Sequence, residues 1–142
     1  MCFTKLLYNH THFNVSHISY KNKKIKVYMA DSAKKQMIGL MYRDKLYDNE
    51  AMLFLPMRYA RHSIWMLNMR FSIDIFWLSK SGEVVDMYEN AKPCKSVFGC
   101  KSYLPKYSSF YVLEMNSGSA RRLGLKLGSQ ISIGSINKSL DL

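Results

Sequence analysis

The sequence predicts a mainly β fold, an antiparallel β-sandwich or partly closed barrel with two short helices. Apolar residues recur at every second position in several short runs, which is the pattern of strands with one buried face. Clusters of Gly, Pro, Asn and Ser separate these runs, and apolar residues at helical spacing occur in only two places. The sequence thus predicts about eight strands and two short helices, a content that suits an antiparallel sandwich or a partly closed barrel.

The N-terminal third is expected to hold two strands and a helix. Residues 1–12 are weakly patterned and are expected to form a loose arm or an added edge strand. Alternating apolar residues predict strands over 13–20 and 25–29. A helix is predicted over 32–41, because apolar residues recur there at helical spacing and Asp31 can accept hydrogen bonds from the free amides of a first turn.

The rest of the chain is expected to consist mostly of strands joined by turns. The segments 73–78 and 83–88 predict a hairpin, and two prolines and a glycine predict a long loop over 90–107. Ser117 opens a second short helix, which Gly124 ends. The other predicted strands cover residues 51–55, 62–67, 108–115 and 130–136.

The composition indicates one soluble globular domain over residues 1–142, with 48% hydrophobic and 22% charged residues. The apolar runs are too short to span a bilayer, and the start of the chain becomes polar too quickly for a signal peptide. We therefore expect a cytoplasmic protein with no membrane span. Three cysteines do not suggest a secreted disulfide scaffold, and whether Cys94 and Cys100 are bridged depends on their geometry.

The chain is basic, with 21 Lys and Arg against 10 Asp and Glu and a formal net charge of +11. A field of this sign would attract nucleic acid, anionic lipid or acidic partners. Net charge alone bears on association and does not identify a function. We therefore favour the plainer explanation that most of these lysines are solvated on outer faces.

A set of short motifs occurs here in the order found in a known family. Over about residues 25–136 the chain resembles the domain of unknown function 192 family of bacteria and archaea. The resemblance implies a compact β-sandwich of jelly-roll type with short helices, and it implies no established activity, cofactor or substrate. The matching motifs are Ala30-Asp31, Gly39-Leu40-Met41 with Arg43, Met52-Leu53-Phe54, Trp65-Met66 with Asn68, Asp74-Ile75-Phe76, Gly82-Glu83-Val84-Val85, Glu89-Asn90-Ala91 with Pro93-Cys94, Tyr111-Val112-Leu113-Glu114, Ala120, Leu123-Gly124-Leu125 and Gly128.

One position departs from the family pattern. The family commonly has a lysine between its Trp-Met pair and its Asn, and this chain has Leu67 there. If that lysine serves an anionic ligand in the family, this chain lacks it.

Asp74 is the most informative polar residue, because it lies inside an otherwise apolar strand. Burying an ionised carboxylate is costly unless hydrogen-bond donors meet it. Asp74 can tie down the preceding loop, 68–72, by accepting from backbone amides or by pairing with Arg43 or Arg70, and this structural role is favoured. The functional alternative is a ligand-facing carboxylate in a pocket walled by Trp65.

Five residues form our candidate ligand-binding site: Arg43, Trp65, Asn68, Asp74 and Glu89. Their clustering around one hairpin suggests a binding module for a small ligand or a protein partner, without catalysis. Nucleic-acid binding through the basic surface is the first alternative. The second is a hydrolase that uses Asp74 and Glu89, which would have to lie within about 10 Å of each other.

No cofactor or metal site is expected. The sequence has no Walker loop, dinucleotide fingerprint or serine elbow. Neither His10 and His12 nor Cys94 and Cys100 show the tight paired spacing of a structural zinc site. Cys94 also lacks a neighbouring histidine to activate its thiol, so no catalytic residue is assigned.

Overall fold

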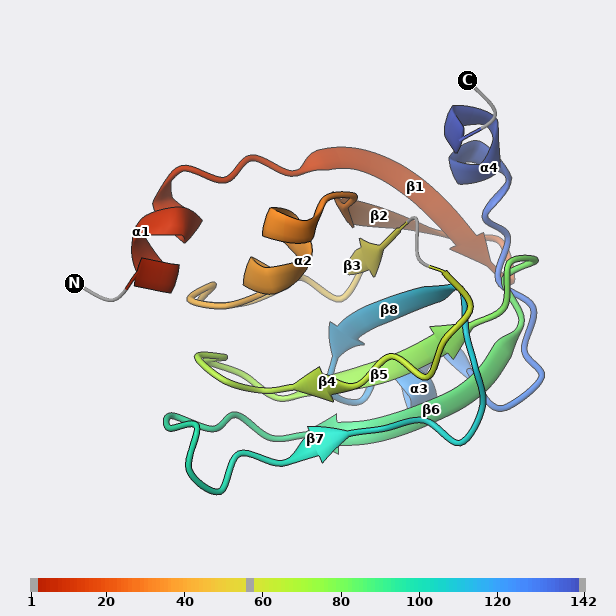
Figure 1. The fold of residues 1–142 in the computed structure, drawn as a ribbon. Helices are drawn as coiled ribbons and strands as arrows, with labels where there is room; N and C mark the ends of the chain where they lie inside the picture. The colour runs from red at the N-terminus through yellow and green to blue at the C-terminus, as the bar shows by residue number, and fades with distance from the viewer. Residues whose placement is uncertain (1–2, 56–57, 141–142) are drawn as a thin grey trace.

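A six-stranded sheet forms the centre of the computed structural model, which describes residues 3–55 and 58–140 (Figure 1). In spatial order its strands are β1 (Asn14–Tyr20), β2 (Lys23–Ala30), β3 (Glu50–Phe54), β8 (Tyr111–Asn116), β5 (Ile73–Leu78) and β6 (Val84–Ala91). A second sheet has two strands, β4 (Ile64–Trp65) and β7 (Ser102–Tyr103). The described residues also form four short helices: α1 (Phe3–Asn9), α2 (Ala33–Ile38), α3 (Ser119–Leu123) and α4 (Gly134–Leu140).

The main sheet has β1 and β6 at its edges and is not a closed barrel. Its strands pair antiparallel except β2 and β3, which run parallel. A parallel pair requires a long connection that returns the chain to the same end of the sheet. The segment 31–49, which contains α2, supplies that connection. The mainly β fold is confirmed, and this parallel pair is a departure from a wholly antiparallel sheet.

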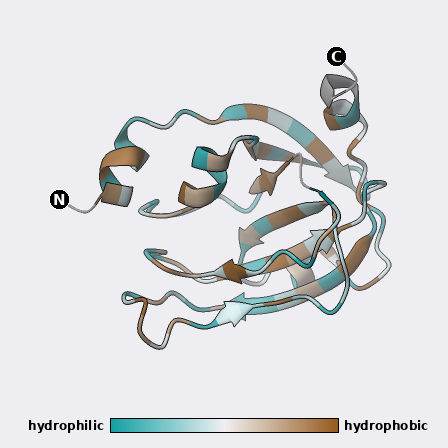
Figure 2. Cartoon of the chain, viewed as in Figure 1, coloured by the Kyte–Doolittle hydropathy of each residue, from teal (hydrophilic) through white to brown (hydrophobic). Residues whose placement is uncertain are grey.

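Buried apolar side chains lie on both faces of the central strands. Figure 2 marks the hydrophobic residues along these strands in brown. All six residues of β5 are buried, as expected for an internal strand. Phe76 and Leu78 pack on one face, against Leu123 of α3 and Ile131. On the other face, Ile75 belongs to a second apolar cluster that includes residues of β4, β7 and the segment after α2. The main sheet is therefore the middle layer of the protein.

Several predicted elements differ from the structure in extent. Ser32, not Asp31, caps α2, since its hydroxyl accepts from the Lys35 amide at 3.3 Å. Asp31 instead pairs with the Lys35 ammonium at 2.9 Å. The strand predicted over 62–67 shortens to β4, and the long loop over 90–107 contains β7.

The predictions for the two ends of the chain also differ from the structure. Residues 3–9, expected in a loose arm or edge strand, form α1, in which Thr4 makes a 2.6 Å hydrogen bond with Tyr42. The segment 130–136 pairs only at isolated positions, Gln130 with Glu83 and Ser132 with Ser19, before α4 begins. Its apolar residues are buried, so the alternation predicted burial correctly but not a continuous ladder. None of the helices in residues 3–55 and 58–140 is long and apolar enough to cross a bilayer.

Cys94 and Cys100 are joined by a disulfide, and their Cα atoms lie 5.6 Å apart. The bond closes a small loop between β6 and β7. The two cysteines, whose pairing could not be decided from the sequence, are thus bridged.

Gly82 turns the chain between β5 and β6 with a φ of +96°. A Cβ at this position would overlap the carbonyl oxygen of Ile131, whose amide donates to the Gly82 carbonyl at 3.0 Å. We expect Gly82→Ala to lower the free energy of unfolding by about 2 kcal/mol, through strain and this overlap. Urea denaturation measures the change.

Gly118 provides the matched control, because its φ is +91° and no atom lies within 4 Å of a Cβ added there. Gly118→Ala should lower the free energy of unfolding only by the cost of the backbone conformation, about 1 kcal/mol. If the two variants lose the same free energy of unfolding, the close approach of residue 82 to Ile131 is unimportant.

Candidate ligand-binding site

A hollow of about 150 Å³ lies between α2, β4 and the main sheet. Its walls come from the segments 36–41 and 63–67, with Phe54 and Met69. The side chain of Glu114, on β8, also faces it. We call this cavity the Glu114 hollow.

Glu114 is the buried polar group of this hollow. β8 lies between β3 and β5, so both of its edges are paired, and its register places Glu114 opposite Met52 and Ile75. Only 4% of the Glu114 surface is exposed, and the group lines the hollow. Among the described residues, no hydrogen bond to its carboxyl group contributes to its pKa, which burial alone raises. Burial raises the pKa of Glu114 to about 8, so the group carries its proton at neutral pH.

The walls of the Glu114 hollow are mostly apolar and adaptable. Met37, Met41, Met66 and Met69 supply thioethers, which are flexible and fit irregular surfaces. Trp65, 48% exposed, stands at the border between the hollow and solvent. A pocket with apolar walls and a few convergent polar groups is the usual form of a small-molecule site.

The chemistry of the Glu114 hollow follows from its protonated acid. A neutral carboxylic acid presents one O–H donor and an oxygen that accepts. Gln36 also lines the hollow, and its amide nitrogen is already engaged with the Ala30 carbonyl at 3.2 Å. A bound group that both donates and accepts would satisfy Glu114 without requiring a charge in the apolar interior.

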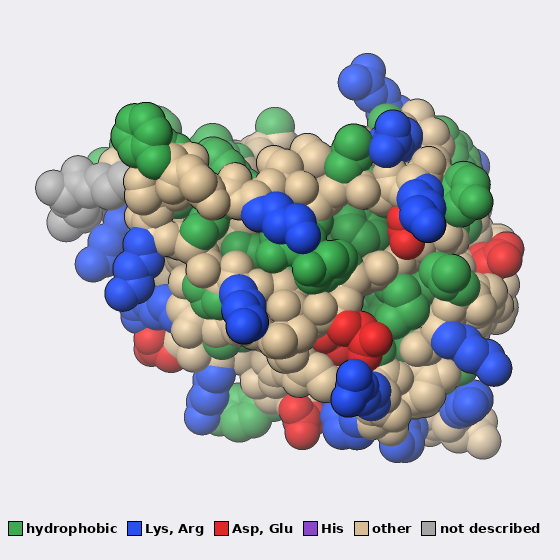
Figure 3. Space-filling view, turned by 90° about the horizontal axis from the view of Figure 1, so that it is seen from below, with side chains coloured by type: hydrophobic (Ala, Val, Ile, Leu, Met, Phe, Trp, Pro, Cys, Tyr) green, Lys and Arg blue, Asp and Glu red, His purple; other side chains and the backbone are tan. Residues whose placement is uncertain are grey.

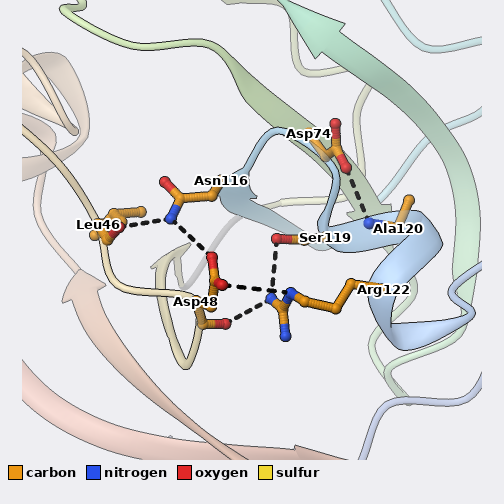
Figure 4. Close-up of polar contacts among 7 residues, drawn as sticks. All are labelled: Leu46, Asp48, Asp74, Asn116, Ser119, Ala120 and Arg122. Atoms are coloured by element: carbon orange, nitrogen blue, oxygen red, sulfur yellow. Dashed lines mark hydrogen bonds and ion pairs between the residues drawn. The ribbon is translucent and has the colours of Figure 1, made fainter.

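Asp74 lies on the opposite face of the sheet, and its position is structural (Figure 4). It is fully buried, and its two oxygens accept from the amides of Asn90 and Ala120, each at 2.9 Å. Asp74 thus fixes both the end of β6 and the start of α3. This arrangement favours the structural role over the functional one.

Further polar contacts hold α3 from its other side (Figure 4). Arg122 donates to the Asp48 carbonyl at 2.6 Å and to the Ser119 hydroxyl at 3.3 Å. Asn116, at the end of β8, donates to the Leu46 carbonyl. These contacts join the loop before β3 to the β8–α3 connection.

A second hollow lies beside Asp74, lined also by Glu89, Asn90 and Arg121. The two carboxyl groups proposed for a hydrolase, Asp74 and Glu89, therefore line the same hollow. Glu89 pairs with the Arg121 guanidinium at 3.5 Å, and both Asp74 oxygens already hold backbone amides. The pair is close in space, but Asp74 is occupied as a structural acceptor.

Arg43 and Asn68 line neither hollow. The Arg43 guanidinium lies over the ring of Tyr28, at 4.3 Å from its centroid, and over that of Phe13. Asn68 turns the backbone with a φ of +59°, and its amide donates to the Cys94 carbonyl at 3.1 Å.

The five residues singled out from the sequence thus do not converge on one cleft. Trp65 lies at the Glu114 hollow, and Asp74 and Glu89 lie at the second. Sequence reasoning passed over Glu114, although the same signal, one acid in an apolar strand, was present there. In the part of the chain that the structure describes, no three His, Cys, Asp or Glu side chains gather closely enough to hold a metal ion.

Sequence relatives cover most of the chain. Residues 15–133 match the model of the DUF192 family, which is described as "Uncharacterized ACR". A UPF0127 protein of Pyrococcus furiosus is 32% identical over 111 residues, which are 78% of this chain and 89% of that protein. A UPF0127 protein of Thermococcus kodakarensis is 36% identical over 109 residues, and the match spans 75% of this chain but only 64% of the relative.

Two solved structures share the fold. A Sinorhizobium meliloti protein, described as a candidate transcription regulator, superposes with a TM-score of 0.76 at 24% identity and covers 86% of this chain and 95% of its own. A Novosphingobium aromaticivorans protein of unknown function gives a TM-score of 0.70 at 26% identity, covering 84% of each chain. The resemblance deduced from the ordered motifs is confirmed.

Proposed function

Because the chain belongs to the DUF192 family, which is described as uncharacterised, we propose its function from its own site: it binds a small molecule in the Glu114 hollow. The ligand class is a mainly apolar molecule with one neutral group, such as an amide or a carboxylic acid, that both donates and accepts hydrogen bonds. Binding is proposed without catalysis.

One observation carries this proposal: Glu114 is buried, and no hydrogen bond from a described residue contributes to the pKa of its carboxyl group. A buried polar group without a partner costs about 1–3 kcal/mol. Titratable groups with strongly shifted pKa values, placed in a hollow, are candidates for functional sites. A ligand that meets the Glu114 acid would recover that cost and gain from burial against Trp65 and the methionines.

The predicted roles of Arg43, Asn68, Asp74 and Glu89 in ligand binding stay predictions. Nucleic-acid binding also stays the alternative, but a nucleic-acid footprint should be a patch of one charge. Figure 3 shows Lys and Arg side chains spread over the face that it displays, with hydrophobic and acidic side chains between them. The small-molecule proposal has the more specific support.

A pair of Glu114 variants tests the proposal. Small amides, carboxylic acids and amines are screened by thermal shift and by amide chemical-shift mapping against the wild type. Glu114→Gln keeps a donor and an acceptor, so amides and acids should still bind it. Glu114→Leu offers neither a donor nor an acceptor. We expect the affinity of amides and acids for this variant to fall about tenfold or more, a loss of about 1.4 kcal/mol or more in binding free energy.

The control variant is Glu83→Gln, which changes an exposed carboxyl group outside the Glu114 hollow and should leave affinity unchanged. Shifts for bound compounds should map to Trp65 and Met66. A screen in which nothing binds, or in which Glu114→Leu binds as well as the wild type, would refute the proposal.

A further inference from the structure

The disulfide loop, residues 94–100, presents apolar side chains to solvent. Phe98 is 89% exposed and Val97 is 58% exposed. The loop extends beyond the ends of β6 and β7 (Figure 1), and the bond between Cys94 and Cys100 closes its base. A cross-link limits the conformations of a loop, so these two side chains are held outward at small entropic cost.

The base of the disulfide loop is fixed to the body of the protein. The Cys94 amide donates to the Met66 carbonyl at 3.1 Å, and the Cys94 carbonyl accepts from the Asn68 amide at the same distance. Trp65 lies opposite Ser102 in the β4–β7 pair and is 48% exposed. Leu104, two residues after Ser102, is 54% exposed. The loop therefore stands beside a small sheet that also carries exposed apolar side chains.

The segment that contains the disulfide loop carries charge of one sign. Between Glu89 and Glu114 the chain has four lysines and no acidic residue. Lys92, Lys95 and Lys101 flank the exposed tip, and all three are themselves exposed. An apolar tip surrounded by lysines is complementary to a surface with an apolar interior and an anionic boundary.

We propose that the disulfide loop docks the protein on an anionic lipid surface, with Val97 and Phe98 entering the boundary between headgroups and acyl chains. The flanking lysines would meet the acidic headgroups, and Trp65 would lie near the interface. Single-stranded nucleic acid is the weaker fit: bases can stack on the rings of Phe98 and Trp65, but the aliphatic Val97 and Leu104 suit an apolar interior better. Trp65 also lines the Glu114 hollow, but Val97, Phe98 and the flanking lysines do not, so the variants of the disulfide loop test the docking apart from the ligand of that hollow.

Vesicle sedimentation tests the docking, with the disulfide intact. Vesicles of equal parts phosphatidylcholine and phosphatidylserine should sediment the wild type and shift its tryptophan emission to shorter wavelength. The double variant V97S/F98S should lower the partition coefficient by about tenfold or more, since it removes the buried apolar area. Each of K92Q, K95Q and K101Q should lower it by roughly fivefold.

Leu127→Ser is the matched control, because Leu127 is 60% exposed but lies in the α3 to 130–136 connection, outside the disulfide loop. It should leave the partition coefficient unchanged, and pure phosphatidylcholine vesicles should bind all variants weakly. A wild type that stays in the supernatant with the anionic vesicles would overturn the proposal. So would equal losses for L127S and V97S/F98S, or a single-stranded RNA that binds through this loop while the vesicles do not.

Discussion

Replacing Glu114 with glutamine is expected to stabilise the protein, and the gain should grow as the pH rises. Burial raises the pKa of Glu114 from its ordinary value of 4.5 to about 8 in the folded protein. Between these values the folded chain keeps a proton that the unfolded chain releases, so the wild type loses stability as pH increases. The loss in the free energy of unfolding is complete above about pH 8. It amounts to about 5 kcal/mol, because each pH unit between the two pKa values contributes about 1.4 kcal/mol.

Urea denaturation of the wild type and E114Q at about pH 5, 7 and 8.5 measures this effect. The free energies of unfolding should differ little at the lowest pH and most at the highest. Taking the difference between the two proteins cancels the other groups that titrate in this range. E89Q is the control for a carboxyl-to-amide change at an exposed position. A constant difference across the range would show that Glu114 ionises normally.

Replacing Asp74 with alanine is expected to lower the free energy of unfolding by about 4 kcal/mol. The variant leaves the amides of Asn90 and Ala120 without their acceptor inside the protein. Each buried amide without a partner costs about 1–3 kcal/mol, and the two hydrogen bonds to the Asp74 carboxyl group are also lost. D74N keeps one acceptor oxygen and should lose about half as much.

Chemical denaturation of D74A and D74N measures the loss, and hydrogen exchange at the Ala120 amide should report it locally. The control is D44A, because the Asp44 side chain is 84% exposed and its pair with Arg70 lies at the surface. Such surface pairs contribute at most about 1 kcal/mol. A D74A protein as stable as D44A would contradict the structural role of Asp74.

The strands could be predicted because their apolar alternation is local. Segments 25–29 and 108–115 lie at β2 and β8, and both faces of β5 are buried as its sequence indicated. The parallel pairing of β2 with β3 could not be read in the same way, since it depends on where a distant connection returns. Residues 130–136 show the same limit, because an alternating segment can be buried without forming a ladder.

The site residues show why sequence alone could not separate two similar acids. Asp74 and Glu114 each interrupt an apolar strand, and both are buried. Asp74 is satisfied by amides 16 and 46 residues away, whereas no hydrogen bond from a described residue contributes to the pKa of the Glu114 carboxyl group. Which of the two acids has its hydrogen bonds satisfied within the protein depends on those distant partners. The resemblance identified the family but, by its nature, no function.

The order of strands in the main sheet has a consequence for biosynthesis. β3 pairs on one side with β8, which leaves the ribosome about 60 residues later. Until then the growing chain carries β3 with one row of backbone groups unpaired and its apolar side chains uncovered, a state that favours aggregation. The nascent chain therefore exposes this edge of β3 until β8 has been made.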